Sequence, residues 1–230
     1  MTQNGIVGFV ESGQRLIESQ KREWNPRDLL ATAKRAELRN TGWPIGLVLQ
    51  GSGHRPVPTP DGIEARLGRY VSGQTEDYWY FHKDGNYYVS RLFEEDYETL
   101  QWTSSEGHPK SSIWFDIRIW RIAEIILHSA TIYRELGIPP EESYYLAINH
   151  KGLKGRELYV SNPRRHIWRG RICHSATATW IREVTQDYVT SNLKILVGEV
   201  SNNLFTLFDF AEISQEVIDS IVNEFLSRKL

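Results

Sequence analysis

The chain has 230 residues, a formal net charge of -2, and a composition of 40% hydrophobic and 24% charged residues. These values are typical of a soluble globular protein, and they exclude a disordered chain, a collagen-like repeat and a disulfide scaffold. The near-neutral charge also excludes a global field that draws the protein to nucleic acid or membranes. We expect one domain, residues 1–230, that buries its own core without staples.

Cys173 is the only cysteine, so neither an intrachain disulfide nor a cysteine-rich zinc site can form. A single unpaired thiol suits a reducing compartment. The N-terminus lacks a basic segment followed by a long apolar one, and no apolar run approaches the roughly 18 residues that span a bilayer. The sequence therefore predicts a cytoplasmic protein without membrane contact.

The first 40 residues are expected to form two helices that pack as an extension of the domain. The second of these starts at Asn25-Pro26, because asparagine is a good N-cap and proline is favoured at the first helical position. Residues 43–49 (WPIGLVL) are predicted to form a buried strand and residues 50–60 a loop. Asp61 followed by Glu64 resembles a capping box, which predicts a short helix up to Leu67.

The clearest local signal predicts a β-hairpin over residues 77–93. Two aromatic runs, YWYF and YYV, flank Asp84-Gly85, and Asp-Gly is favoured in two-residue hairpin turns because both central positions need a positive φ. Tyr78 and Tyr80 project opposite to Trp79 and Phe81, so aromatic side chains occupy both faces. Either both faces are covered, or one is exposed and forms an interface.

The second half of the chain alternates helices with clustered strands. A loop (94–112), a short strand (113–116) and a helix (117–136) ended by Gly137 are followed by strands at 143–149 and 157–160. A third strand (172–184) and two amphipathic helices (189–205 and 213–226) complete the chain. Because strands cluster instead of alternating singly with helices, the order predicts an α+β fold. Its antiparallel sheet is expected to be built from hairpins 77–93, 143–160 and 172–184, packed with amphipathic helices.

The familiar catalytic signatures are absent from the sequence. It contains no phosphate-binding loop, no dinucleotide-binding glycine motif, no H-E-x-x-H and no G-x-S-x-G. Cys173 and His174 are adjacent on a predicted strand and therefore point to opposite faces. The acidic run at 94–98 falls in a predicted loop and favours a solvated surface. We expect no catalytic residue, no metal site and no cofactor.

The most informative feature is a basic segment, residues 151–171. It contains seven cations and one acid, Glu157, which gives a net charge of +6 in a chain that is otherwise acidic. Interleaved Tyr159, His166 and Trp168 add groups that stack on bases. Three interpretations stay open: contact with nucleic acid or another anionic ligand, contact with an acidic protein partner, and a solvated face. The candidate anion-binding residues are Lys151, Lys154, Arg156, Arg164, Arg165, Arg169 and Arg171, of which the first three are placed to form an anion nest at the turn.

Three short stretches resemble one protein family. They are RAE at 35–37 running into TGWPIG at 41–46, KDG at 83–85, and FDIRI at 115–119. Together they are similar to the region that follows the Schlafen-type AlbA domain in some bacterial putative regulators, over residues 25–210. The resemblance implies an accessory or sensing domain without catalytic residues. Because the AlbA-type domain itself is absent from the sequence, its cleavage or nucleotide-binding activity is not carried over.

These observations favour a non-catalytic recognition or sensing module that works in a cytoplasmic complex with a protein partner. Its basic segment is expected to contact nucleic acid or another anionic ligand. One alternative is a nuclease or nucleotide-processing enzyme whose site is assembled from distant residues. Another is a structural subunit that uses its aromatic side chains to bind a protein.

Overall fold

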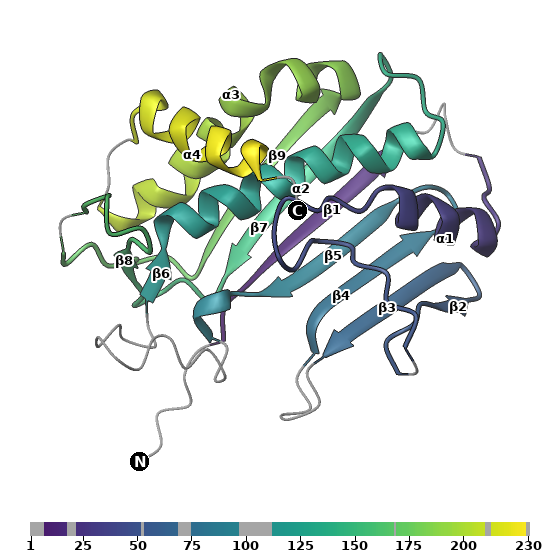
Figure 1. Cartoon of the computed structure of the whole chain (residues 1–230), viewed down its shortest axis with the longest axis horizontal. Helices are drawn as coiled ribbons and strands as arrows, with labels where there is room; N and C mark the ends of the chain where they lie inside the picture. The colour runs from purple at the N-terminus through teal and green to yellow at the C-terminus, as the bar shows by residue number, and fades with distance from the viewer. Residues whose placement is uncertain are drawn as a thin grey trace.

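A computed structural model describes residues 7–17, 22–51, 53–68, 75–96, 112–167, 169–209 and 213–228. Within them a seven-stranded sheet is packed against four helices, and a two-stranded sheet lies at one end (Figure 1). The helices are Pro26–Arg35 (α1), Phe115–Glu135 (α2), Gln186–Phe205 (α3) and Gln215–Ser227 (α4). The strands are Phe9–Leu16 (β1), Val57–Thr59 (β2), Gly62–Gly68 (β3), Thr75–His82 (β4), Tyr87–Leu92 (β5), Ser112–Trp114 (β6), Ser143–Lys151 (β7), Glu157–Tyr159 (β8) and Thr177–Thr185 (β9).

The large sheet has the strand order β2-β3-β4-β5-β1-β7-β9, and every neighbouring pair is antiparallel. The strand nearest the N-terminus, β1, lies between β5 and β7. It therefore joins the β2–β5 meander to the β7–β9 pair. The small sheet pairs β6 with β8 in parallel.

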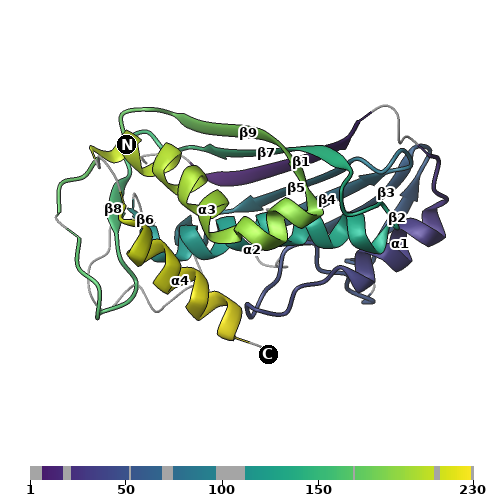
Figure 2. The ribbon, with the colours of Figure 1, turned by 90° about the horizontal axis from the view of Figure 1, so that it is seen from above.

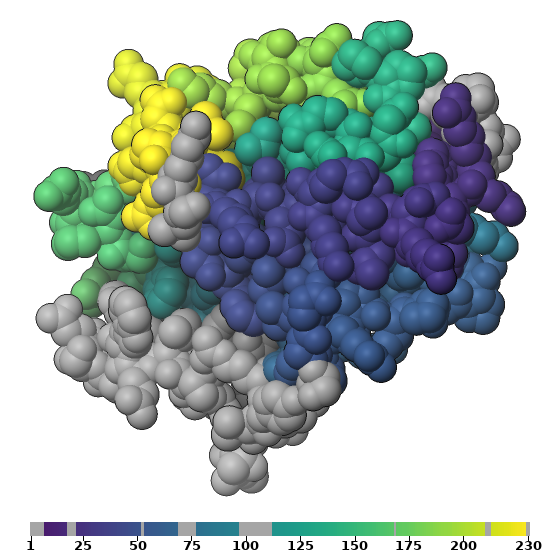
Figure 3. Space-filling view, turned by 45° about the vertical axis from the view of Figure 1, so that its right-hand side comes forward, coloured from purple at the N-terminus to yellow at the C-terminus, as the bar shows by residue number. Residues whose placement is uncertain are grey.

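All four helices lie on the same side of the large sheet (Figure 2). The segment between α1 and β2, in dark blue in Figure 3, packs on this helix side as well. The Asn40 side chain donates a hydrogen bond to the carbonyl oxygen of Phe225 in α4 (3.3 Å), and the Thr41 hydroxyl donates one to Glu124 in α2 (2.7 Å). Within the described part of the chain, no helix is both long and apolar enough to cross a bilayer.

The helix-facing side of the sheet and the inner faces of the helices form one continuous hydrophobic core. Side chains along a strand alternate between the two faces, so every second residue enters this core. On β4 these residues are Trp79 and Phe81, both with no exposed surface. Tyr133 of α2 packs edge-on against Tyr144 of β7, with ring centroids 4.5 Å apart. This aromatic contact thus joins α2 to the sheet.

The predicted α+β class, with an antiparallel sheet packed against helices, is confirmed. The hairpin at 77–93 is confirmed as β4 and β5. Its predicted two-residue turn is wrong: the backbone N–H of His82 donates to the carbonyl oxygen of Asn86 (2.8 Å), which leaves three residues in the turn, and Gly85 has a positive φ (+85°) while Asp84 does not. The expected pairing within 143–160 is wrong. The two edges of β7 are occupied by β1 and β9, so β8 has no edge of β7 to pair with and joins β6 instead. The third predicted strand begins at Thr177, not at 172.

Three local predictions in the first 70 residues are wrong. The first predicted helix is in fact strand β1. Two of its core-facing residues, Ser12 and Gln14, are polar, so the sequence shows no hydrophobic alternation there. The predicted helix at 61–67 is β3, in which Ile63, Ala65 and Leu67 alternate inward. Residues 43–49 form no strand. Side chains satisfy part of their backbone instead: the Trp79 indole N–H donates to the carbonyl oxygen of Leu47 (3.0 Å).

The acidic run after β5 is not a solvated loop over the residues that the structure describes. Glu94 pairs with Arg118 and Arg121 of α2, and the Arg121 distance is 2.6 Å. The Glu95 side chain is 1% exposed and accepts a hydrogen bond from the backbone N–H of Trp114 (2.6 Å). Burial raises the pKa of Glu95 to about 7. These acids therefore tie the end of β5 to the start of α2, and the rest of the predicted loop lies outside the described residues.

Two buried histidines predict an acid-sensitive fold. Burial lowers the pKa of His128 to about 4 and that of His150 to about 3, from an ordinary value of 6.5. Between a pH of 6.5 and a pH of about 4, the unfolded chain binds protons on both side chains and the folded chain does not. Each histidine should therefore lower the free energy of unfolding by roughly 1 kcal/mol per pH unit in this range. Glu95 has the opposite effect, because its pKa in the folded chain is raised. The folded chain binds one more proton than the unfolded chain at Glu95, and two fewer at the two histidines.

Urea unfolding at about pH 7 and about pH 5 measures this dependence. We expect lower stability at the acid pH, and a shallower decline in a His128→Asn variant. An equally steep decline in that variant would show that His128 does not carry the effect.

Candidate functional site

The structure divides the basic segment into cations that stabilise the fold and cations that face solvent. Lys151 pairs with Glu11 of β1 (2.7 Å), and Arg165 pairs with Glu224 of α4. Arg156 is 3% exposed and donates to both carboxylate oxygens of Asp96, at 3.0 and 2.6 Å. The expectation that Arg156 lines an exposed anion nest is therefore corrected, because its guanidinium is enclosed and holds a buried acid.

Three of the seven predicted cations are well exposed: Lys154, Arg164 and Arg169. Arg171 is half-buried, and the proposed stacking residue Trp168 lies outside the described residues. The net charge of +6 in the sequence thus does not become one continuous cationic surface. What remains is a set of exposed cations on the loops around β8.

A second surface, the side of the large sheet opposite the helices, contains a hollow. One row of directly opposed residues crosses five strands: Tyr80 on β4, Tyr88 on β5, Gly13 on β1, Ala147 on β7 and Ile181 on β9. The two smallest side chains stand near the middle of this row and larger ones stand at its ends. A Cβ atom built on Gly13 meets nothing within 4 Å. The row is therefore concave.

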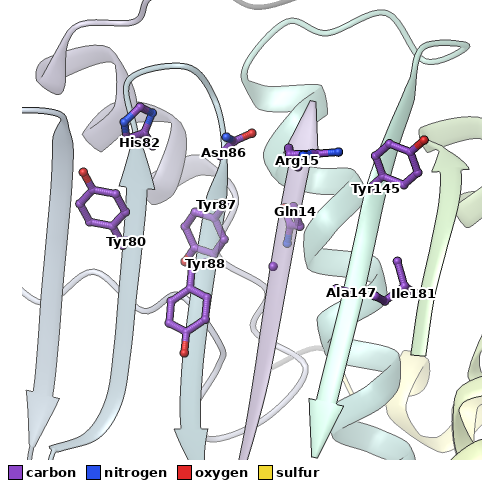
Figure 4. Close-up of a pocket in the computed structure, with 11 residues that line it drawn as sticks. Gln14, Arg15, Tyr80, His82, Asn86, Tyr87, Tyr88, Tyr145, Ala147 and Ile181 are labelled. Carbon is purple, nitrogen blue, oxygen red and sulfur yellow. The ribbon is translucent and has the colours of Figure 1, made fainter. Parts of the chain in front are cut away.

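The hollow has a volume of about 680 Å³ and opens to solvent. Figure 4 shows Tyr80 and Tyr88 on one side of β1, and Tyr145 and Ile181 on the other. Tyr145 is 38% exposed and Ile181 is 64% exposed. The lining residues are Gly13, Gln14, Arg15, Tyr80, His82, Asn86, Tyr87, Tyr88, Tyr145, Ala147 and Ile181. No carboxylate stands among these residues, so the hollow offers aromatic rings and one arginine without an acid.

Neighbouring groups hold two of these rings in place. The Tyr88 hydroxyl donates to Glu11 (2.9 Å), the same carboxylate that Lys151 binds. Burial and this hydrogen bond raise the pKa of Tyr88 to about 12, so its hydroxyl stays neutral at physiological pH. The exposed Arg15 places its guanidinium 5.4 Å from the centre of the Tyr145 ring, a cation–π distance. Its polar N–H groups face solvent beside the aromatic surface.

One pair of titratable side chains lies at the edge of the hollow. Paired titratable groups within hydrogen-bond reach are what a general acid–base or nucleophilic mechanism uses. Among the lining residues, the histidine is His82, and its ring pairs with Asp84 in the β4–β5 turn (2.6 Å). No group of three or more histidine, cysteine, aspartate or glutamate residues in the described ranges is placed to hold a metal ion.

The sequence indicated only part of this site. The hairpin pattern left open whether one aromatic face was exposed. In the structure Trp79 and Phe81 are buried and Tyr80 lies on the open face. The contributions of Gly13 and Arg15 were missed because their segment was predicted as a helix. Tyr145 was recoverable from the alternation in SYYLAIN, which places it opposite the buried Tyr144.

Comparisons with known proteins add no assignment. No family model matches the chain, and no curated protein or solved structure is significantly similar to it. The resemblance to the region after the Schlafen-type AlbA domain therefore stays a prediction.

A pair of glycine substitutions tests the geometry of the hollow. Gly13→Val places its side chain in open space and should raise the free energy of unfolding by about 0.5–1 kcal/mol, because glycine is unfavourable within a strand. Gly62→Val is the matched control on β3. Its Cβ would lie 2.1 Å from the carbonyl oxygen of Phe81, so it should destabilise the protein strongly.

Thermal and urea unfolding of both variants measure the difference. A Gly13→Val variant as unstable as Gly62→Val would contradict an open hollow at β1.

Proposed function

We propose that this protein is a non-catalytic recognition module that binds single-stranded nucleic acid on the open face of its large sheet. One observation carries the proposal: Tyr80, Tyr88, Tyr145 and Arg15 surround the small residues Gly13 and Ala147, with no carboxylate among the lining residues. A single-stranded nucleic acid has the matching chemistry, since it presents flat bases and negatively charged phosphates.

Stacking supplies the first part of the argument. Sequence-tolerant binding of single strands rests on aromatic side chains that accept successive bases, each worth about 1–3 kcal/mol. Tyr80 and Tyr88 are on adjacent strands, and Tyr145 stands across the gap left by Gly13. The volume of about 680 Å³ falls within the range of small-ligand sites and suits one or two bases. Duplex DNA, whose bases are already stacked inside, does not fit this arrangement.

Charge supplies the second part. Arg15 can bind a phosphate through two parallel hydrogen bonds while its planar group lies near the Tyr145 ring. Strand β7 leads from the hollow to Lys151 and then to the loops that carry the exposed Lys154 and Arg164. A nucleic-acid strand that extends beyond the hollow in the direction of β7 would meet these cations. Glu11, which is on the same face, is neutralised by Lys151, so it adds little repulsion.

The other two function classes make different demands. An enzyme of phosphodiester chemistry needs carboxylates that face a substrate, and the described acidic run instead pairs with arginines of α2. A purely structural subunit needs the open face to be covered by a protein. It would bind no oligonucleotide at any salt concentration.

Fluorescence anisotropy of labelled single-stranded DNA and RNA, with a duplex of the same sequence, tests the proposal across a salt series. We expect single strands to bind more tightly than the duplex. The variants Tyr88→Leu and Arg15→Ala should each weaken binding roughly 5- to 150-fold, the equivalent of one lost stacking or charged contact. Arg27→Ala is the matched control, since Arg27 is exposed on α1, on the helix side. Equal affinities of all three variants and the wild type would contradict the proposal.

A second variant tests the contribution of the basic segment. Arg164→Glu/Arg169→Glu reverses two exposed cations and leaves the Arg165–Glu224 pair intact. We expect weaker binding and a salt dependence shallower by about 0.7 per lost phosphate contact. Binding that disappears in this variant and survives every change in the hollow would place the ligand on the basic segment alone.

A further inference from the structure

The two edges of the large sheet are protected very differently. Exposed sheet edges invite pairing with other strands, and proteins guard them with short strands, proline, lysine or bulges. The β2 edge is three residues long and contains Pro58. The β9 edge is nine residues long, with the sequence TATWIREVT; its charges are Arg182 and Glu183, and it contains no proline, glycine or lysine. Compared with the β2 edge, the β9 edge is therefore nearly unguarded.

The β9 edge is also regular and exposed. All nine residues of β9 pair with β7 in one unbroken register, so the outer edge is straight enough to accept another strand. Among the described residues, no hydrogen bond reaches the outward backbone groups of residues 178–184. The middle residue of the strand, Ile181, is 64% exposed. An exposed apolar centre on an unguarded edge is typical of a pairing surface.

We propose that β9 pairs with β9 of a second copy of this chain, antiparallel about a two-fold axis through Ile181. In such an isologous contact each copy contributes the same strand, so the β9 edges of both copies are paired at once. The two seven-stranded sheets then form one continuous sheet. The helices of both copies stay on the same side of it.

The length of the strand and its side chains together select this register. With the axis at Ile181, all nine residues overlap, Ile181 meets its own copy, and Glu183 lies opposite Thr179. On the helix side Arg182 lies opposite Trp180, a favourable cation–π pairing. Moving the axis to Arg182 or to Glu183 would oppose identical charges, which is destabilising across a strand pair. A second copy of β9 can therefore pair along the full length of the strand without opposing like charges. This favours a second copy of the chain as the partner over an unrelated strand.

One side chain of the edge is already held before the edge pairs. Arg182 is bound by Glu199 of α3 (2.5 Å), and its guanidinium lies 5.0 Å from the centre of the Tyr188 ring. Pairing therefore does not have to immobilise this long side chain. The proposal does not rest on nucleic-acid binding. Ile181 also lines the hollow, however, so the two-fold axis would bring the hollows of both copies next to one another.

Sedimentation equilibrium of the full chain tests the dimer. We expect a concentration-dependent dimer for the wild type and a monomer for Ile181→Lys, which replaces a side chain that is 64% exposed and so spares the core. Val57→Lys is the matched control on the guarded β2 edge, where Val57 is 43% exposed, and it should stay dimeric. Circular dichroism verifies that all three chains are folded. A monomeric wild type, or a dimer that survives Ile181→Lys, would overturn the proposal.

Disulfide trapping tests the register. Residues directly opposite in an antiparallel pair have Cα atoms about 4.5–5.5 Å apart, within disulfide range. Ile181→Cys should therefore form an intermolecular disulfide when oxidised glutathione takes up the two electrons and two protons. Thr179→Cys should not, because its copy would lie roughly 13 Å away along the strand. The native Cys173 is 1% exposed and contributes little background. Trapping through Thr179→Cys and not through Ile181→Cys would refute the Ile181 axis.

Discussion

Helices cover one face of the seven-stranded sheet, and this one-sided cover is the constraint from which the rest of the structure follows. Every strand places alternate side chains on opposite faces. Trp79 and Phe81 therefore enter the core, while Tyr80 on the same strand lies on the open face. Tyrosine suits that position, because its ring offers apolar surface and its hydroxyl stays compatible with water. A sheet covered on both sides would have needed these positions to be fully apolar.

A buried ionic cluster holds the segments at one end of the sheet together. The Phe93 ring lies next to two guanidinium groups, with Arg118 at 4.7 Å and Arg156 at 5.2 Å from its centre. Arg156 binds Asp96, and Asp96 also accepts a hydrogen bond from the backbone N–H of Gly8 (2.6 Å). The acidic run and the basic segment are separate in the sequence, but the Arg156–Asp96 pair joins them in the structure. The charges that remain exposed are fewer than composition suggests.

The hollow and the unguarded edge are both consequences of the position of β1 and β9. Because β1 is an interior strand of the sheet, its Gly13 opens a gap within the open face. Because β9 is the last strand, Ile181 belongs both to the rim of that gap and to the sheet edge. The proposed nucleic-acid site and the proposed dimer contact therefore share one residue, Ile181. They remain separable, since Gly13 and Tyr88 lie away from the edge.

The sequence by itself determined the α+β class, the β4–β5 hairpin and the helices at α1, α2, α3 and α4, because these depend on local periodicity, caps and turn residues. It did not determine β1, since the core-facing Ser12 and Gln14 carry no hydrophobic period. Nor could it place Arg156, because its acid partner is 60 residues away along the chain. Strand order, the open face and the gap at Gly13 were decided only by the tertiary structure. They depend on which strands become neighbours, and local sequence does not encode pairing between distant segments.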